Sequence, residues 1–463
     1  MEKPNILLIT TDTQRCDTLK CMGNEKAISP NIDKLADEGV LFEKAHTSSP
    51  VCGPTRASLI TGVHTPIHGC IENGIKRRDD MPVFTDLLKE QGYTNIMVGK
   101  THFEPIPDSI DILKKDLSDP ERIQETIKQI KKVSQNKDPF FAFCSINGPH
   151  TPLLVPDKWA DLYKMEELPE INYRPGELEK HSPAMKRLLG LDGSIEEFKS
   201  LSYAKDFPLG HLYEAQGLKI NDFDLEEINK FRRKYYSFAA YCDHLIGKLL
   251  DFINQSGLRK NTLIIFSSDH GFQNFDHGFN DKHTFFDESW RVPLIISMPG
   301  TIPCGEKRDF AIWNDITATI LGAANTEGKT VQGFDLFTPL VHNEKNPRNC
   351  AVGTLFKSAA LATNNWKLIY YFEEKEGRLF NTKEDPQEQN DLYYNNNFED
   401  IRNRLIKALL TWRSDICDLH YLIENSSMGG PVASRSNYLI RKMKGIDSEK
   451  RLNEMVDEID NEF

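Results

Sequence analysis

The chain lacks a long apolar run, an excess of positive charge and a paired pattern of cysteines. No stretch approaches the roughly 18 apolar residues that a membrane-spanning helix requires, so we expect no membrane segment. Lys and Arg number 57 against 69 Asp and Glu, and the net charge of -12 argues against nucleic acid as a partner. The nine cysteines are odd in number and scattered singly, which does not match a disulfide framework.

The start of the sequence lacks the pattern of a secretory signal peptide. "MEKPNILLITTDTQ" carries one lysine before a short apolar run that ends at Asp12, which is typical of a buried first strand. Together with the unpaired cysteines, this pattern predicts a reducing, cytoplasmic location. The 463 residues, of which 39% are hydrophobic and 27% charged, suffice for one large globular domain, alone or with a smaller one.

Apolar runs of strand length alternate with helical patterns over most of the chain. This alternation predicts an α/β fold, in which helices sandwich a mostly parallel central sheet. The predicted strands cover residues 5–11, 95–100, 140–146, 262–269 and 292–297, and the predicted helices cover 29–40, 83–93 and 229–257.

After about residue 345, shorter strands separated by turns indicate an antiparallel sheet. These predicted strands cover residues 350–356, 358–363, 366–372 and 377–382. A helix is expected near 397–413, and the charged tail over 442–463 is expected to form a surface helix or to be partly disordered. We therefore predict a large α/β domain over residues 1–345 and a smaller C-terminal α+β subdomain over 346–463.

Two acidic residues follow predicted strands directly. Asp12 and Asp269 each come after an apolar run, where a single Asp is often only a turn cap. The carboxyl ends of parallel strands meet at one edge of a sheet, however, and two carboxylates that converge there would repel each other. A divalent cation relieves this repulsion. Oxygen ligands suit Ca²⁺ or Mg²⁺, and His270 as a further ligand also admits Mn²⁺.

Basic residues follow the same predicted strands. Lys100 and His102 come after the strand over 95–100, His150 lies in "GPHTPL", and Lys282 stands thirteen residues after Asp269. Each lysine alone is typical of a solvated surface charge, and each histidine alone of a structural residue. Together with a metal they describe a pocket for a tetrahedral oxyanion ester and a proton transfer.

A cysteine opens a predicted helix in "PVCGPTRASLITG", residues 50–62. Cys52 lies near Arg56, and a thiol at a helix N-terminus beside an arginine has a lowered pKa and is reactive. The alternative interpretation is a free thiol that happens to lie near a helix start.

"CGPTRASLITG" resembles the signature of the type I sulfatases, which belong to the alkaline phosphatase-like superfamily. The resemblance extends through "PNILLITTD", "YTNIMVGKTHF", "NGPHTPL", "SDHGF", "RVPLII" and "GRLFNTKEDPQEQNDL", in that order along the chain. It implies a sulfuric ester hydrolase. It also implies that a maturing enzyme reads Pro54 and Arg56 and oxidises Cys52 to formylglycine, whose hydrate attacks sulfur in place of the thiol.

The resemblance also implies a set of metal ligands. Asp12, Asp269 and His270 match the family's ligands, and the modified Cys52 would complete the set. Thr13 occupies a ligand position at which many relatives have Asp or Gln. A threonine oxygen is a weaker, uncharged ligand, so the affinity for the metal and its identity are open.

Further roles follow from the same matches. Arg56 resembles the residue that holds the hydrate, while Lys100 and Lys282 resemble those that bind sulfate oxygens. His102 resembles the group that assists the hydrate, and His150 resembles the one beside the leaving group.

Several alternatives stay open at this point. A phosphonate monoester or phosphodiester hydrolase would share this chemistry, and a catalytically dead relative could act as a binding protein. His277 matches a recurring family histidine but is equally well explained as structural. The expected substrate is a small organic or sugar sulfate, such as a glycosaminoglycan fragment or choline sulfate. Whether the protein acts as a homo-oligomer is open.

Overall fold

The centre of the computed structural model is an eight-stranded sheet. The structure describes residues 3–136, 138–181, 186, 218–220, 224–424 and 445–462. The strands, in the order in which they lie across the sheet, are β10 (Glu306–Ile312), β2 (Val40–His46), β9 (Leu294–Ser297), β7 (Thr262–Ser268), β1 (Asn5–Asp12), β5 (Phe140–Pro149), β3 (Thr94–Gly99) and β4 (Ile112–Lys114).

Most neighbours in this sheet are parallel, as the sequence predicts. β1 lies between β5 and β7, with Ile6 opposite Phe141 on one side and Leu263 on the other. Only β9 runs against its partners β2 and β7 among the strands of this sheet. Every residue of β1 is buried, which explains why its sequence is continuously apolar and does not alternate.

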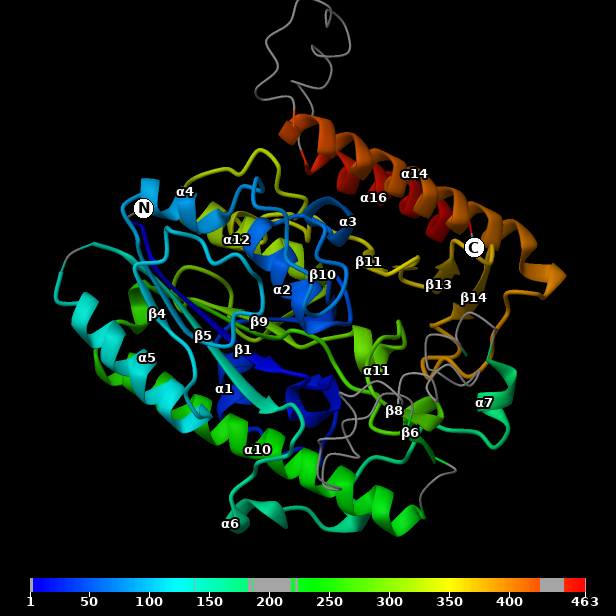
Figure 1. The fold of residues 1–463 in the computed structure, drawn as a ribbon, viewed down its shortest axis with the longest axis horizontal. Helices are drawn as coiled ribbons and strands as arrows, with labels where there is room; N and C mark the ends of the chain where they lie inside the picture. Colours follow the sequence, from blue (N-terminus) through cyan, green and yellow to red (C-terminus); the bar gives the residue numbers. More distant parts are fainter. Residues whose placement is uncertain are drawn as a thin grey trace, which may run out of the picture.

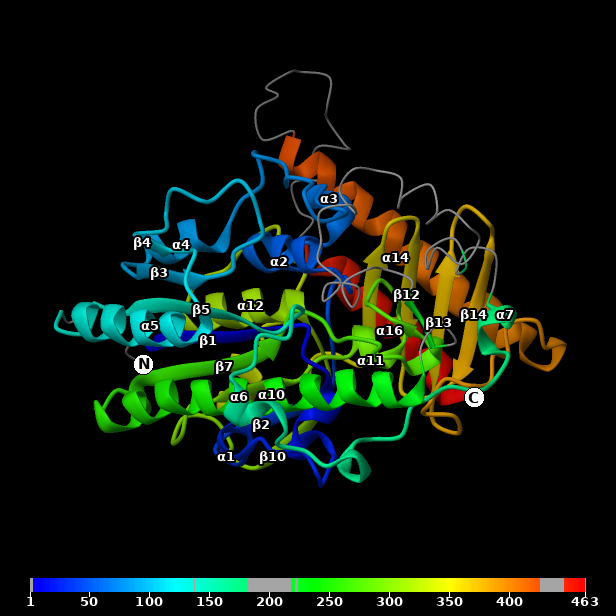
Figure 2. The same ribbon diagram turned by 60° about the horizontal axis from the view of Figure 1, so that its bottom comes forward.

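Helices cover both faces of the sheet (Figures 1 and 2). Ile6 and Leu8 of β1 point to the face covered by α2 (Cys52–Thr61), α4 (Phe84–Glu90) and α12 (Trp313–Ala323). Leu7 and Ile9 point to the opposite face, because successive side chains of a strand alternate. That opposite face is covered by α1 (Pro30–Asp37), α5 (Asp119–Val133) and α10 (Leu225–Gln255).

Shorter elements connect these layers. They are the helices α3 (Thr65–His68), α6 (Asp157–Ala160), α7 (Glu177–Lys180), α11 (Asp287–Trp290) and α13 (Phe337–Val341), the 3₁₀ turns η1 (Cys16–Thr18), η2 (Lys20–Met22), η3 (Met165–Glu167), η7 (Arg259–Asn261), η8 (Asp276–Gly278) and η9 (Asn396–Phe398), and the small strand pair β6 (Leu218–Lys219) and β8 (Phe279–Asn280). Within the described ranges, we find no helix with both the length and the apolar character that crossing a membrane demands.

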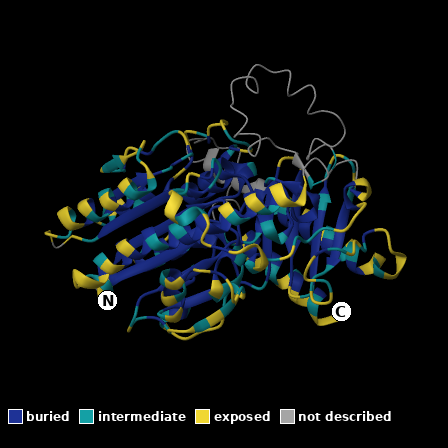
Figure 3. Ribbon diagram, turned by 90° about the horizontal axis from the view of Figure 1, so that it is seen from below, coloured by how far each residue is buried: buried dark blue, intermediate teal, exposed yellow. Residues whose placement is uncertain are grey.

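A separate antiparallel sheet follows toward the C-terminus, as predicted. Its strands lie in sequence order, β11 (Ala351–Leu355), β12 (Ser358–Ala362), β13 (Trp366–Tyr371) and β14 (Glu376–Asn381). Two helices, α14 (Glu399–Glu424) and α16 (Asp447–Glu462), pack beside it (Figure 2). The surface helix predicted for the charged tail is present as α16, and its apolar residues Leu452, Val456 and Ile459 are buried against α14 and this sheet. The burial colouring shows the strands of both sheets as the buried interior (Figure 3).

A buried charged cluster attaches α16 to the rest of the molecule. The Glu449 carboxylate lies 3.1 Å from His64 Nε2 and accepts hydrogen bonds from Arg348 (2.9 Å) and from the Trp412 indole (2.8 Å). Arg348 also donates to Asp315 at the start of α12. The side chains of the charged members are fully buried, so each needs the others to compensate its lost hydration.

Candidate active site

Two buried carboxylates meet at the carboxyl edge of the parallel sheet. Asp12 ends β1 and Asp269 follows the adjacent strand β7, and neither has any exposed surface. Cys52, at the start of α2, and His270 point to the same place. One potential ligand atom from each of these four residues lies within 4.8 Å of the others. We call Asp12, Cys52, Asp269 and His270 the carboxylate site.

The orientation of His270 is fixed by its own backbone neighbourhood. Its Nδ1 lies 2.7 Å from the carbonyl oxygen of Gly271, which leaves Nε2 directed at the Cys52 sulfur at 3.0 Å. Asp269 Oδ1 accepts hydrogen bonds from the backbone amides of Thr13 and His270, both at 3.0 Å. These hydrogen bonds fix the carboxylate and the imidazole before any ligand binds.

Thr13 has an unusual backbone conformation beside Asp12. Its φ is +65°, and its hydroxyl donates to Asp12 Oδ1 at 2.8 Å. The Thr13 carbonyl in turn accepts a hydrogen bond from the Tyr235 hydroxyl at 2.6 Å. Thr13 therefore lies beside the predicted metal ligands, and its side chain donates a hydrogen bond to one of them, Asp12.

The Arg56 side chain contacts both carboxylates. Its guanidinium donates to Asp269 Oδ2 at 2.8 Å, to Asp12 Oδ2 at 3.3 Å, and to the Lys100 carbonyl and the Ser145 hydroxyl, each at 2.8 Å. The side chain is completely buried. Burial alone would lower its pKa, but the charges of Asp269 and Asp12 raise it. A planar cation of this kind holds both carboxylates in a fixed position relative to each other.

Two lysines and a histidine lie next to the carboxylate site. Lys100 Nζ lies 2.5 Å from Asp12 Oδ2, whereas Lys282 Nζ lies 3.3 Å from the Cys52 sulfur and 3.4 Å from His150 Nε2. The Lys100 and His150 side chains are 19% and 26% exposed, although the carboxylate they approach is not exposed at all. Solvent or a substrate therefore reaches the carboxylate site from their side.

The electrostatics of Cys52 follow from this ring of cations. Burial works to raise its thiol pKa, but the charges of Lys100, Lys282 and His270 and a hydrogen bond from His102 bring the pKa well below its ordinary value. His102 reaches the sulfur from the loop after β3, where its φ is +57°. The side chain at position 52 is only 1% exposed, so it is surrounded by groups that stabilise a negative charge.

The same cations determine the state of Asp12. Burial and the Cys52 charge work to raise its pKa, but Lys100, His150 and Arg56 together lower it. Two carboxylates, one imidazole nitrogen and position 52 form a donor set that fits a hard divalent cation.

His277 belongs to a different buried group. Its Nδ1 lies 2.6 Å from Glu177 of α7, its Nε2 lies 3.5 Å from Glu288 of α11, and its ring stacks on Phe286. We call His277, Glu177 and Glu288 the His277 cluster. Burial opposes protonation, but the two carboxylates raise the pKa of His277 to about 9. The cluster connects the segment around α7 to the loop that carries Lys282.

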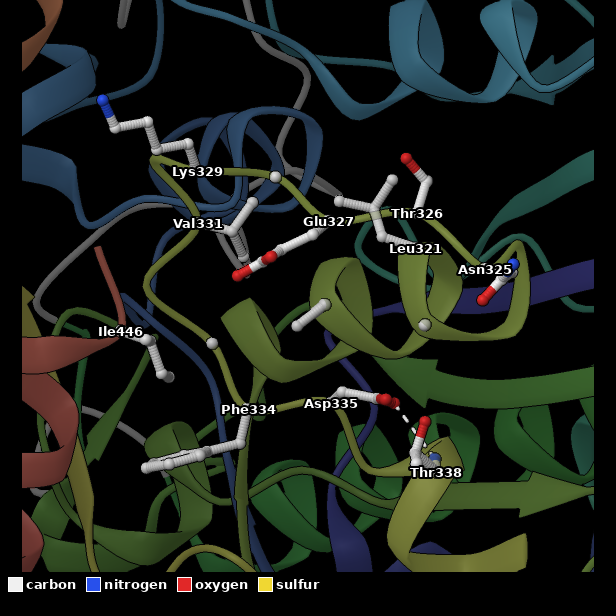
Figure 4. A pocket seen from close by; sticks show the side chains of 14 residues that line it. Leu321, Asn325, Thr326, Glu327, Lys329, Val331, Phe334, Asp335, Thr338 and Ile446 are labelled. Carbon is white, nitrogen blue, oxygen red and sulfur yellow. Dashed lines mark hydrogen bonds between the residues drawn. The ribbon is translucent and has the colours of Figure 1, made fainter. Parts of the chain in front are cut away.

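A separate cavity of about 490 Å³ lies beside the C-terminal end of α12 (Figure 4). It is lined by α12, by the segment over residues 325–335 and by Ile446, and its polar side chains include Glu327 and Lys329. It shares no residue with the carboxylate site.

Sequence reasoning missed two residues that hold this site. Ser145 accepts from Arg56, and its only signal was a polar residue inside the buried run "FFAFCSI". Tyr235 holds Thr13 from α10, 222 residues away along the chain, and no local pattern marks it.

Comparisons with known proteins agree over most of the chain. The family model described as Sulfatase matches residues 4–326, and the one described as N-sulphoglucosamine sulphohydrolase, C-terminal, matches residues 275–415. The N-acetylglucosamine-6-O-sulfatase of Bacteroides thetaiotaomicron is 24% identical over 479 aligned positions, which cover 88% of this chain and 86% of the relative.

Two solved structures share the fold. One, of a protein in complex with its substrate D-glucosamine-2-N,6-O-disulfate, has a TM-score of 0.75 at 22% identity and covers 90% of this chain and 99% of its own. The phosphonate monoester hydrolase of Agrobacterium radiobacter has a TM-score of 0.78 at 21% identity, with 89% and 96% covered. At these identities the likeness establishes the fold and leaves the substrate to chemical argument.

Proposed function

The chain belongs to the sulfatase family and is a sulfuric ester hydrolase, and on that premise we propose that it releases sulfate from a small sugar, using a formylglycine at position 52 and a divalent cation. The observation that carries this proposal is a set of basic side chains around position 52. Lys282 contacts the Cys52 sulfur, His150 contacts Lys282, and Lys100 contacts the neighbouring Asp12. A sulfated sugar is consistent with the relative named as an N-acetylglucosamine-6-O-sulfatase.

The carboxylate site would hold the cation. Asp12, Asp269 and His270 would supply two oxygens and one nitrogen, with position 52 beside them. The oxygen-rich set favours Ca²⁺, with Mg²⁺ or Mn²⁺ as alternatives, and the uncharged Thr13 adds no further anionic ligand. When bound, such a cation supplies charge neutralisation and Lewis-acid polarisation of a sulfate oxygen.

Position 52 would carry the nucleophile after modification by a maturing enzyme, which supplies the oxidant. The hydrated aldehyde provides one hydroxyl for attack on sulfur and a second that allows sulfate to leave. The chain prepares this position by placing it on the first residue of α2, enclosed by His270, Lys282 and His102.

The remaining residues manage charge and protons. Lys100 and Lys282 would hold the non-bridging sulfate oxygens, since the charges of both ammonium groups already act on the side chain at position 52. His150 Nε2 lies 3.4 Å from Lys282 Nζ on the exposed side, where it would protonate the departing sugar oxygen. Arg56 positions Asp12 and Asp269 by donating a hydrogen bond to each.

Hydrolysis of phosphonate monoesters is a second candidate activity, favoured by the TM-score of 0.78 to the phosphonate monoester hydrolase. Matched nitrophenyl esters of sulfate and of a phosphonate separate the two activities. Sulfate is expected to be the better substrate by kcat/KM, and a preference for the phosphonate would reassign the enzyme.

Mass spectrometry of protein produced together with a maturing enzyme tests the nucleophile. The peptide that contains residue 52 is expected to be about 18 Da lighter than its thiol form, the difference between a thiol and an aldehyde. Cys52→Ala should abolish sulfate release, whereas Cys304→Ala, at an exposed cysteine, should leave it intact. Full activity in protein that contains only the unmodified thiol would refute the proposed nucleophile.

A further inference from the structure

The turn between β11 and β12 exposes a strained aromatic residue. Phe356 connects Leu355 of β11 to Lys357 and β12, and it has a φ of +48°. Its side chain is 43% exposed. Glycine is the residue that adopts this backbone conformation easily, and a bulky side chain there is an outlier that the protein maintains against a local cost.

Phe356 reaches the loop that carries the catalytic lysine. Its ring lies parallel to the ring of His283, with centroids 6.2 Å apart and planes inclined by 14°. His283 directly follows Lys282, and its backbone amide donates to the carbonyl of Pro50, two residues before Cys52. The strained turn therefore places an exposed aromatic ring against His283, which is the residue after Lys282.

The ionised carboxylate of Glu72 lies near the Nε2 edge of the His283 ring. Glu72 Oε2 is 3.7 Å from His283 Nε2. Burial works to raise the Glu72 pKa, but contacts with His283 and the charge of Lys282 lower it. The next residue, Asn73, accepts a hydrogen bond from the Gly53 amide at the start of α2, at 2.8 Å. Glu72 is thus attached to the same helix start as the nucleophile.

We propose that Phe356 and Glu72 form the binding surface for the alcohol part of the substrate, a proposal that rests on the proposed function. The exposed Phe356 ring packs against the apolar face of a pyranose ring, as aromatic rings do in concave sites with few polar groups. The Glu72 carboxylate accepts hydrogen bonds from hydroxyl or ammonium groups on that ring and repels a second sulfate or carboxylate. The substrate class is therefore a pyranose monosulfate that carries hydroxyl or amino groups.

Two primary alkyl sulfates test the aromatic surface with matched leaving groups, N-acetylglucosamine 6-sulfate and the acyclic 2-methoxyethyl sulfate. Phe356→Gly should raise KM for the sugar about tenfold, as expected for loss of one aromatic stacking contact, with kcat almost unchanged. KM for the acyclic ester should stay constant. Equal changes for both esters, or none for the sugar, would overturn the proposal.

A matched variant controls for backbone strain. Lys375 has a φ of +56° in the exposed turn between β13 and β14. Lys375→Gly and Phe356→Gly should both preserve or raise the melting temperature, because glycine adopts this conformation without strain. Only Phe356→Gly should alter KM. A similar rise of KM in Lys375→Gly would show that the effect does not come from the aromatic surface.

Sugar binding without chemistry separates this proposal from the catalytic one. Cys52→Ala protein should still bind the desulfated sugar, N-acetylglucosamine. Adding Phe356→Gly to this protein should weaken that binding, measured by calorimetry, by about the same factor as the rise in KM. If the natural protein releases no sulfate but Phe356→Gly still weakens sugar binding, the proposed chemistry is wrong and the proposed binding surface is supported. Glu72→Gln should raise kcat/KM for a disulfated sugar relative to the monosulfate, and an unchanged ratio would remove Glu72 from the proposal.

Discussion

Raising the pH above neutrality should weaken the fold through His277. The imidazole is fully buried between the carboxylates of Glu177 and Glu288, and it lies close to that of Glu388 as well. These anions raise its pKa from 6.5 to about 9 in the folded protein. His277 therefore binds its proton more tightly in the folded protein than in the unfolded chain, so protonation of His277 stabilises the fold.

The size of this effect follows from the two pKa values. A shift from 6.5 to about 9 corresponds to roughly 3 kcal/mol of stability. Because the folded-state pKa is the higher one, this contribution is complete below about pH 6.5 and disappears as the pH rises through about 9. Between pH 7 and pH 10 the free energy of unfolding should therefore fall by roughly 2 to 3 kcal/mol.

Urea unfolding from pH 6 to pH 10 measures this loss, and His277→Gln provides the reference. Glutamine cannot be protonated, so the variant should be less stable at pH 6 but should lack this part of the pH dependence. Glu388, whose pKa is raised by burial to about 7, titrates nearby and is present in both proteins, so their difference removes its contribution. Parallel stability curves for the two proteins would refute the assigned charge of His277.

Three further predictions concern other parts of the molecule. Asp269→Asn removes one proposed carboxylate ligand of the cation, so the fall in melting temperature that a chelator causes in the natural protein should vanish in calorimetric scans. An unchanged fall would show that the cation binds elsewhere. His150→Ala should lower kcat/KM for a sugar sulfate by about 10²–10⁴-fold but should hardly change kcat/KM for nitrophenyl sulfate. Lys282→Ala should lower kcat/KM for both substrates. Equal losses of kcat/KM on the two substrates in His150→Ala would exclude His150 as the proton donor. Glu449→Gln should lower the free energy of unfolding by about 3 kcal/mol in urea titrations, since it removes one of the two carboxylates that pair with the buried Arg348. A change below about 1 kcal/mol would contradict that role.

The core of the fold and the carboxylate site could be read from the sequence because both depend on local patterns. Asp12 and Asp269 directly follow apolar runs, and the rule that parallel strands end at one edge brings them together without further information. Strand β10 escaped prediction because its first half, which begins at Glu306, alternates partly exposed and exposed residues at the border of the sheet. β2 escaped because partly buried charges interrupt its apolar run.

Contacts between distant segments could not be predicted in the same way. The four hydrogen bonds of Arg56 depend on the positions of four strands, β1, β3, β5 and β7, and the sequence around Arg56 contains none of them. The buried face of α16 was missed because Leu452, Val456 and Ile459 are diluted by charged neighbours, and composition outweighed their helical spacing.

The cluster around Glu449 also bears on when the active site becomes inaccessible during synthesis. His64, which follows α2 closely, is separated from Glu449 by 385 residues. A ribosome that adds 5–20 residues per second needs about 20 to 80 s to cover that distance. During this interval the segment that begins at Cys52 cannot acquire its full set of native contacts, although in the finished fold Cys52 is 1% exposed. The proposed modification of Cys52 would therefore compete with chain elongation, and faster translation should shorten the time available for it.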